Sequence, residues 1–375
     1  MLHCLRTIMK QMLSHHKVGL LVLITTLIFT YLNVQNMSKE NIMIKDALKV
    51  EGGEDAEYND EKVKHIMSMT AEEIQESYTN DCSNTKIDKW VQQERTEIED
   101  EVSNIKGHRL PDIILIGMFK GGTGTLNTWL PSHPQVARVK LSGYYATDEK
   151  YKLSHREHLL LMPNVSDDEI IYERCTECFT KQAARERILA AYPQRNVKLF
   201  VMVRDPIERL ISGYVQNVIQ NKTTKNKVQI KKTFEEYIFY SNGTIRTDTE
   251  YFQKSFYVAH FAKWLMLFPK ENIHLIDAEI FTKTPWIELQ KIEQLLKIDH
   301  FFTKDRFPTN PEKPNFRCFI KDYEEGMQCM GEAKGRTHPN ISEETMQTLR
   351  KYFKPFNEQF FTLAGQKFAW SVYYE

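Results

Sequence analysis

The segment at residues 113–126 constrains the fold of this chain more than any other feature; it reads IILIGMFKGGTGTL. Its first four residues are apolar and mostly β-branched, which predicts a buried strand of a parallel sheet. A turn rich in glycine follows, and an amphipathic helix comes after it. Backbone amides of such a turn, at the start of a helix, can surround a phosphate group, and Lys120 adds a positive charge. The segment therefore predicts an α/β fold with a phosphate-binding loop after a parallel strand.

The order of residues in this loop separates it from the ATP-binding loop of P-loop NTPases. In a Walker A loop the lysine follows the last glycine, whereas Lys120 precedes Gly121, Gly122 and Thr123. This order disfavours an ATPase or a nucleotide kinase. Considered by itself, a glycine-rich turn of purely structural role remains the alternative.

Two more apolar segments, at 197–203 and 273–277, predict further strands, and a helical stretch around 256–268 lies between them. Strands that alternate with helices imply a mostly parallel sheet covered on both faces. The expected fold class is α/β, a P-loop-like parallel β-sheet flanked by helices. Ligands of such sheets bind beyond the carboxyl ends of the strands, where Lys120 and Arg204 both fall.

Arg204 begins a second motif, in which Ser212 lies on the helix that starts at Pro206. A guanidinium group can grip a phosphate with several donors, and a serine hydroxyl can add another. The alternative is a local ion pair between Arg204 and Asp205 that caps the helix. Because the first loop already predicts a phosphate site, we favour the nucleotide interpretation.

A third motif, CMGEAKGRTHP at 329–339, contains a basic-glycine-basic turn. Together with the first two motifs and the tail at 349–370, it resembles the heparan sulfate glucosamine 3-O-sulfotransferases, and the related N-deacetylase/N-sulfotransferases share its Lys-Gly-Arg segment. The resemblance covers about residues 111–370. It implies the sulfotransferase fold and 3′-phosphoadenosine-5′-phosphosulfate (PAPS) as co-substrate, with no metal. The implied nucleotide-binding residues are Lys120, Gly121, Gly122, Thr123, Gly124, Thr125, Arg204, Ser212, Lys334, Gly335, Arg336, Thr337 and His338.

The resemblance also implies a disulfide between Cys318 and Cys329, which an oxidising compartment permits. The role of the motif Cys175-Thr176-Glu177-Cys178 is left open. No second Cys-x-x-Cys and no thioredoxin-like context accompany it, so a redox pair or half of a zinc site is disfavoured. Cys82 is a possible disulfide partner for one of these two cysteines.

The acceptor side departs from the family pattern. The family's glutamate and histidine after the first helix are Ser142 and Tyr144 here, and its arginine after Lys-Gly-Gly-Thr is Gly124. A lysine that the family carries further along the chain is replaced here by Arg174, which keeps the positive charge but not the chemistry of an ammonium group.

Two explanations of these departures compete. Either the acceptor differs and the base is Glu173, Glu177 or Asp148, or the chain binds the donor and catalyses little. We expect Lys120, Glu173 and Arg174 to be the catalytic residues.

The N-terminus predicts a membrane anchor. Residues 18–34 are uncharged and largely apolar, and Arg6, Lys10 and Lys17 precede them, which predicts a cytosolic N-terminus. A cleaved signal peptide is the alternative, but no small-x-small cleavage site follows. The expected organisation is a cytoplasmic tail (1–17), a signal anchor (18–34), a lumenal stem (35–108) and a sulfotransferase domain (109–375). A short apolar span suits the Golgi membrane, which predicts a single-pass type II protein with a lumenal catalytic domain.

The 50 Lys and Arg residues balance the 50 Asp and Glu residues, which argues against a general nucleic-acid binder. A carboxylate-free segment at 222–232 with five lysines is either a solvated surface or a site for a polyanionic glycan. The sequence contains five Asn-x-Ser/Thr triplets. The one at Asn36 lies too near the expected membrane span for use, which leaves Asn164, Asn221, Asn242 and Asn340 as candidate glycosylation sites.

The sequence thus predicts transfer of the sulfuryl group of PAPS to a glycan hydroxyl, most simply on a glycosaminoglycan such as heparan sulfate. The alternatives are a chondroitin or dermatan acceptor and a non-catalytic glycan-binding protein that retains the fold.

Overall fold

The computed structural model describes residues 86–102, 105, 108–223, 233–331 and 335–375. All of them belong to one compact unit, His65–Glu375. The expected tail, the expected anchor and most of the expected stem lie outside the described residues, as does most of the lysine-rich segment. Within the described ranges, no helix is long and apolar enough to cross a membrane.

A single sheet of five parallel strands forms the centre of this unit, which confirms the expected α/β class. Three of the strands match the expected apolar segments, whereas β2 and β3 were not expected. In spatial order the strands are β2 (Val136–Arg138), β3 (Ile170–Arg174), β1 (Ile113–Gly117), β4 (Lys198–Val203) and β5 (Ile273–Asp277).

The register of the three central strands brings their carboxyl ends to one edge of the sheet. Leu115 of β1 pairs with Arg174 of β3 on one side and with Phe200 of β4 on the other. The segments that follow these strands therefore start side by side. This edge gathers the glycine loop after β1, the Cys-x-x-Cys turn after β3 and Arg204 after β4.

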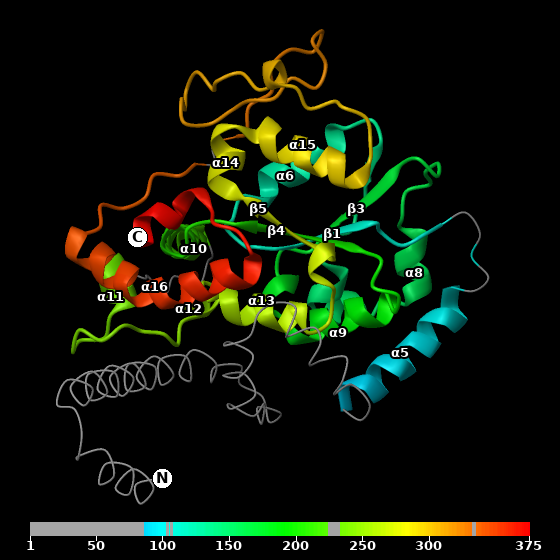
Figure 1. The fold of residues 1–375 in the computed structure, drawn as a ribbon, viewed down its shortest axis with the longest axis horizontal. Coiled ribbons are helices and arrows are strands. Elements are labelled where there is room, and N and C mark those ends of the chain that lie inside the picture. Colours follow the sequence, from blue (N-terminus) through cyan, green and yellow to red (C-terminus); the bar gives the residue numbers. More distant parts are fainter. Residues whose placement is uncertain (1–85, 103–104, 106–107, 224–232, 332–334) are drawn as a thin grey trace, which may run out of the picture. The chain divides into compact units, whose positions relative to one another are not determined.

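Helices cover both faces of the sheet, as Figure 1 shows. On one face lie α6 (Thr123–Trp129), α14 (Ala278–Lys283) and α15 (Pro285–Leu296), and on the other lie α9 (Gln182–Ala191) and α13 (Tyr257–Leu265). The other helices are α5 (Lys86–Val102), α7 (Asp148–Tyr151), α8 (His155–Leu160), α10 (Pro206–Thr223), α11 (Phe234–Ile238), α12 (Glu250–Gln253) and α16 (Glu343–Ala364). Short 3-10 turns occur at Leu130–Ser132, Tyr144–Ala146, Cys178–Thr180, Lys270–Asn272, Lys304–Arg306 and Ala369–Tyr374.

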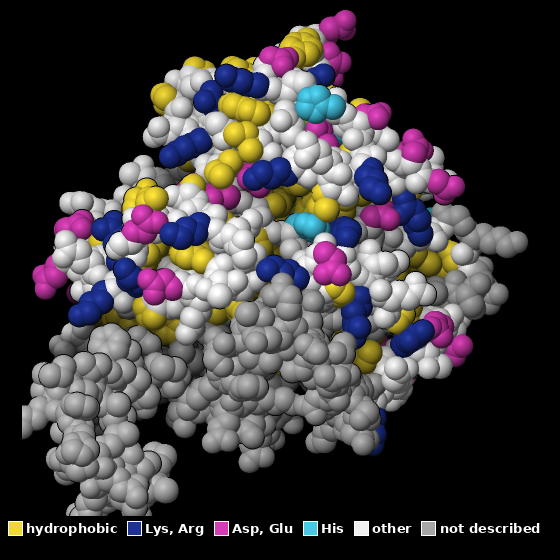
Figure 2. Space-filling model, viewed as in Figure 1, with side chains coloured by type: hydrophobic (Ala, Val, Ile, Leu, Met, Phe, Trp, Pro, Cys, Tyr) yellow, Lys and Arg dark blue, Asp and Glu magenta, His cyan; other side chains and the backbone are white. Residues whose placement is uncertain are grey.

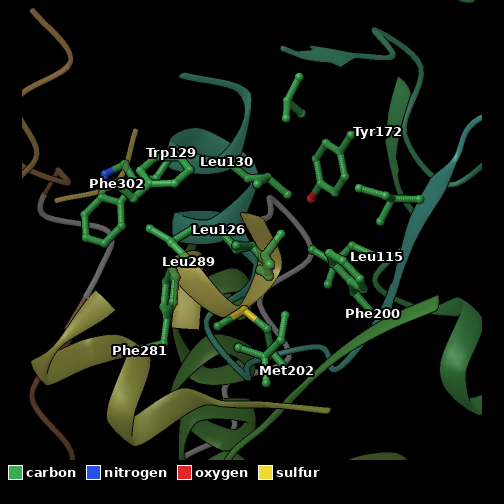
Figure 3. Close-up of a cluster of buried hydrophobic side chains, with 14 of the residues drawn as sticks. Leu115, Leu126, Trp129, Leu130, Tyr172, Phe200, Met202, Phe281, Leu289 and Phe302 are labelled. Carbon is green, nitrogen blue, oxygen red and sulfur yellow. The ribbon is translucent and has the colours of Figure 1, made fainter. Parts of the chain in front are cut away.

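The core between α6 and the sheet fixes the glycine loop at both of its ends. Leu126 and Leu130, from α6 and the turn after it, pack with Leu115, Tyr172 and Phe200 of the strands (Figure 3). Each such buried side chain contributes on the order of 1.5–3 kcal/mol. The loop between β1 and α6 is therefore held between two well-packed elements.

Helix α5 precedes the expected domain boundary at residue 109, yet it packs on α8 and α9. Ile98 is buried there, and Glu94 accepts a hydrogen bond from the hydroxyl of Tyr151 at 2.6 Å. The same carboxylate lies 3.2 Å from Nε2 of His155. The packed unit thus extends N-terminal to residue 109.

Candidate active site

The loop after β1 needs glycine at two successive positions. A Cβ atom on Gly121 would lie 2.7 Å from the carbonyl oxygen of Met202 in β4, too close for any other residue. Gly122 has φ of +98°, in the left-handed region that favours glycine. The backbone between Met118 and Thr123 can therefore lie directly against the end of the sheet.

Lys120 of this loop and Arg336 of the third motif meet at one side chain of α10. Nζ of Lys120 lies 3.4 Å from Oε1 of Gln216, and Nη1 of Arg336 donates to the same oxygen at 2.6 Å. Sequence reasoning did not single out Gln216. The signal was available, because Gln216 lies four residues after Ser212 and thus on the same side of α10.

Arg204 and the third motif also meet on α10, at Glu208. Nη2 of Arg204 lies 3.2 Å from Oε2 of Glu208, and Nδ1 of His338 lies 3.1 Å from the same oxygen. Nε of Arg204 also lies 3.9 Å from Glu279 of α14. Asp205 has another role: its carboxylate accepts from the Ile207 amide at 2.8 Å and from the Tyr374 hydroxyl at 2.9 Å.

The two glutamates beside Arg204 differ in charge state. The hydrogen bond from His338, with help from the charge of Arg204, holds the pKa of Glu208 below its usual range despite burial. Burial raises the pKa of Glu279 to about 7, although Arg204 opposes the shift. The charge beside Arg204 therefore changes near neutral pH.

Arg209 supports the glycine loop from inside the protein. It is fully buried, and its Nη2 donates to Oγ of Ser255 at 2.8 Å and to the carbonyl oxygen of Tyr251. Nη1 lies 3.5 Å from the carbonyl oxygen of Phe119, the residue before Lys120. Its position five residues after Arg204 in the second motif was the only sequence signal for this role.

A disulfide-closed hairpin supports the third motif. Cys318 and Cys329 form a disulfide, and Phe319 and Gln328 pair across the hairpin as an antiparallel bridge. Gly335 has φ of +61°, and a Cβ atom there would lie 2.7 Å from the ring of Phe316, just before the hairpin.

The remaining expected nucleotide-binding residues are placed as follows. Thr123 is buried at the start of α6, where Gly124 and Thr125 continue its first turn. Ser212 is half-buried on α10, and Thr337 is exposed. Lys334 lies outside the described residues.

On the acceptor side, the structure contradicts one expected catalytic residue. Glu173 has no exposed surface, and its Oε2 lies 3.4 Å from Nε2 of His158, which is itself buried beneath the sheet. The His158 ring stacks on Tyr144 with their centres 3.6 Å apart. The expectation that Glu173 acts on the acceptor is therefore wrong, because a glycan hydroxyl cannot reach a carboxylate enclosed in the core.

Arg174, also expected to be catalytic, lies at the carboxyl end of β3 and is half-buried. Its Nε is buried and has no hydrogen-bond partner among the described residues. Of the other two candidate bases, Asp148 is exposed and pairs with Arg187 of α9, whereas Glu177 is partly exposed and lies 3.1 Å from Lys181.

Cys175 and Cys178 form a second disulfide, and both are fully buried. They pair with each other, so the suggestion that Cys82 pairs with one of them is wrong. Cys82 itself lies outside the described residues. The disulfide closes the turn directly after β3, at the same edge of the sheet as Lys120.

A glycine-rich loop with a lysine lies at the carboxyl edge of a parallel sheet, and α10 links it to two arginines and a histidine, an arrangement whose chemistry suits a phosphorylated ligand. A family model for the sulfotransferase domain matches residues 110–358, and the chain belongs to this family. The resemblance expected from the motifs is thereby confirmed.

Curated relatives agree with this assignment. The human heparan sulfate glucosamine 3-O-sulfotransferase 3B1 is 33% identical over 265 residues, which are 70% of this chain and 65% of that protein. The mouse heparan sulfate glucosamine 3-O-sulfotransferase 5 is 31% identical, over 70% of this chain and 74% of that protein. The chain thus spans slightly less than two thirds of the first relative.

A solved sulfotransferase from Alicyclobacillus acidocaldarius shares the fold, with a TM-score of 0.50 and 16% identity. The match covers 71% of this chain and 100% of that one.

Proposed function

We propose that this chain transfers the sulfuryl group of PAPS to a hydroxyl of a glycosaminoglycan, with heparan sulfate as the first candidate acceptor. One observation carries the proposal: α10 joins all three expected nucleotide motifs, through Gln216 and Glu208. Family membership supports the reaction class. The names of the relatives support the choice of acceptor.

The residues present fit a phosphosulfate. Gly121 and Gly122 allow the loop to pack against Met202 at the end of β4, so that α6 starts directly after the loop and its first backbone amides can bind an anion. Lys120 supplies a positive charge on the same loop. PAPS, when bound, supplies the activated sulfuryl group. Lys120 stabilises the negative charge that develops on the leaving phosphate, and Arg204 with Ser212 holds the 3′-phosphate. Arg336 and His338, which meet the same α10 side chains as Lys120 and Arg204, add further contacts to the nucleotide.

A polyanionic acceptor fits the charges around the turn after β3. Lys150, Lys181 and Lys254 all contribute positive potential at Glu177, and Arg174 lies at the end of the same strand. In Figure 2, Lys and Arg side chains extend across the middle of the face shown, and many Asp and Glu side chains lie toward its margins. Such a distribution attracts sulfated or carboxylated chains.

A chondroitin or dermatan acceptor is the second candidate. Ser142 and Tyr144 replace two residues of the family's acceptor side, and such a change suits a different acceptor. Oγ of Ser142 donates to the carbonyl oxygen of Arg174 at 2.9 Å. The Tyr144 hydroxyl donates to the carbonyl oxygen of Leu153 at 3.0 Å. Both side chains are thus engaged with the protein.

We further propose that the protein resides in the Golgi membrane as a single-pass type II protein, anchored by residues 18–34. Only the sequence supports the anchor. Glycosylation in the lumen is compatible with Asn164, Asn242 and Asn340, which are exposed, whereas Asn221 lies in the last turn of α10.

Incubation of the full-length chain with radiolabelled PAPS and separate heparan, chondroitin and dermatan acceptors tests the function. We expect labelled sulfate on at least one of them. Binding of 3′-phosphoadenosine-5′-phosphate (PAP) without transfer to any acceptor would favour the non-catalytic alternative.

A further inference from the structure

The proposed reaction needs a group that accepts the proton of the acceptor hydroxyl. Ser142 and Tyr144 occupy the family's glutamate and histidine positions, and neither a serine nor a buried tyrosine hydroxyl accepts a proton near neutral pH. Burial and nearby carboxylates raise the pKa of Tyr144 well above its usual value. A base must therefore come from elsewhere at the same edge of the sheet.

We propose that Glu177 is the catalytic base, displaced in sequence from the family's position onto the disulfide-closed turn after β3. This inference rests on the proposed sulfotransferase function and adds the residue that activates the acceptor.

The position of Glu177 supports this role. Cys175 and Cys178 enclose it within the turn, and the amide of Cys175 donates to the carbonyl oxygen of Leu115 in β1 at 2.8 Å. The turn also approaches Gly117, because a Cβ atom there would lie 3.8 Å from the carbonyl oxygen of Thr176. The backbone of Glu177 is therefore held in place next to β1, the strand that leads to Lys120.

Side chains connect Glu177 with the lysine of the glycine loop. The ammonium group of Lys254 contributes positive potential at Glu177 and lies 5.4 Å from the centre of the Phe119 ring. Nζ of Lys120 lies 6.0 Å from the same ring centre. A sugar positioned over Phe119 would lie close to the leaving-group lysine and to Lys254, a charged neighbour of the proposed base.

The charged neighbours keep Glu177 in the form that accepts a proton. Burial raises its pKa, but the hydrogen bond from Lys181 and the charges of Lys181, Lys254 and Lys150 outweigh burial and hold the pKa below 4.5. Tyr251 is the other titratable neighbour, and burial raises its pKa to about 12, so it remains neutral. Glu177 is thus a carboxylate throughout the neutral range.

The two rival carboxylates are excluded by position. Glu173 is enclosed with His158 in the core. Asp148 pairs with Arg187, whose guanidinium also stacks 4.2 Å from the centre of the Tyr151 ring, on the side of α9. Of the three candidate bases, only Glu177 lies on the disulfide-closed turn after β3, at the carboxyl edge of the sheet.

In the step itself, a carboxylate oxygen of Glu177 takes the proton of the acceptor hydroxyl. The hydroxyl oxygen bonds to sulfur while the bond from sulfur to the 5′-phosphate oxygen breaks, and PAP leaves with that electron pair. The products are the sulfate ester, PAP and protonated Glu177, which then returns its proton to solvent. No oxidant, reductant or metal enters this balance.

The test compares Glu177→Gln, Glu177→Asp and Lys181→Met with wild type in the full-length chain. Glu177→Gln should lose 10²–10⁴ in kcat, the effect typical of a lost general base, while its PAP affinity by calorimetry stays within about twofold. Glu177→Asp should recover part of the rate. Asp148→Asn is the matched control and should keep the rate within about threefold.

The pH profile of Lys181→Met tests whether Glu177 acts as a base, because this profile would not change if Glu177 had a purely structural role. This substitution keeps the carboxylate but removes the hydrogen bond that lowers the pKa of Glu177. The acid limb of the kcat/KM profile should therefore shift to higher pH, with less than a tenfold loss at pH 7.5. The assignment is overturned if Glu177→Gln keeps a rate within tenfold of wild type. It is also overturned if the acid limb of the Lys181→Met profile stays at the wild-type pH. A wild-type chain that binds PAP but transfers no sulfate overturns the proposed function itself, and the base assignment with it.

Discussion

His338 and Glu208 are in contact at the proposed nucleotide site, with Nδ1 of the histidine 3.1 Å from Oε2 of the glutamate. Glu208 lies in the first turn of α10, and His338 lies three residues after Gly335, the glycine next to Phe316. Because Arg204 binds the same carboxylate oxygen, the Glu208 side chain positions one side chain from each of two segments that are far apart in the sequence. The arrangement of the proposed nucleotide site therefore depends on α10 as much as on the loops.

Replacing Arg204 with alanine should weaken PAP binding by about 10–100-fold, because charge-assisted hydrogen bonds contribute about 1.5–3 kcal/mol. Isothermal titration calorimetry of the full-length chain measures this directly. Arg95→Ala is the matched control, because Arg95 lies on α5 and pairs with Glu99 of the same helix. Equal affinities of wild type and Arg204→Ala would contradict the assignment of this site.

Lys120→Ala should reduce the rate of sulfate transfer by about 10²–10³, because the positive charge beside the leaving phosphate is lost. Ser142→Ala should change the rate by less than about tenfold, since its hydroxyl donates to a backbone carbonyl. Single-turnover assays with radiolabelled PAPS compare the two variants. A large loss in Ser142→Ala would show that the hydroxyl takes part in acceptor binding or catalysis.

Glu279→Gln should flatten the pH dependence of PAP binding. The pKa of Glu279 is about 7, so its carboxyl group is largely neutral at pH 6 and negatively charged at pH 8. The charged form lies beside Arg204 and repels a phosphate, so wild-type affinity should fall several-fold more than that of the variant between these two pH values. Titrations at both pH values test this, and parallel curves would contradict it.

The carboxyl group of Glu279 also affects the stability of the fold. Its folded-state pKa is raised from 4.5 to about 7, so the folded state holds the proton more tightly than the unfolded state. The free energy of unfolding of wild type should therefore fall relative to Glu279→Gln as pH rises through this window. Urea denaturation at pH 5 and pH 8 measures the difference.

The two disulfides should differ in what their removal changes. Loop-closure entropy predicts a loss of about 3 kcal/mol for Cys318→Ser/Cys329→Ser and about 2 kcal/mol for Cys175→Ser/Cys178→Ser. The first double variant should also weaken PAP binding, because its hairpin follows Phe316. The second should retain PAP binding and lose sulfate transfer, because its turn carries Glu177. Peptide mapping without reductant checks both pairings, and identical effects on binding and transfer would contradict this division.

The sequence predicted the sheet where strands were long and apolar. The segments that became β1 and β4 have nearly continuous apolar runs, because both faces of these strands are covered, and β5 has three apolar residues among its five. β2 has only three residues, and β3 ends in Glu173 and Arg174, so neither matches an apolar pattern. These two segments are strands because they pair with neighbouring strands, and a local sequence pattern does not contain that information.

The donor side was more predictable than the acceptor side for a similar reason. Lys120, Gly121 and Gly122 belong to one short motif whose chemistry is local. The burial of Glu173 depends on α8, which brings His158 beneath the strand. The meeting of Lys120 with Arg336 at Gln216 joins segments that are far apart in the chain. Such relationships arise only in the folded chain.

The contact between Phe316 and Gly335 has a consequence for how such a protein changes during evolution. The aromatic ring leaves no space for a side chain at residue 335, and it lies two residues before the Cys318 disulfide. Substitutions at Phe316 can therefore alter how firmly Arg336 is held without altering any charged group at the site. Selection acting on Phe316 would in this way adjust how fast a nucleotide leaves the proposed site while the charged groups of that site are conserved.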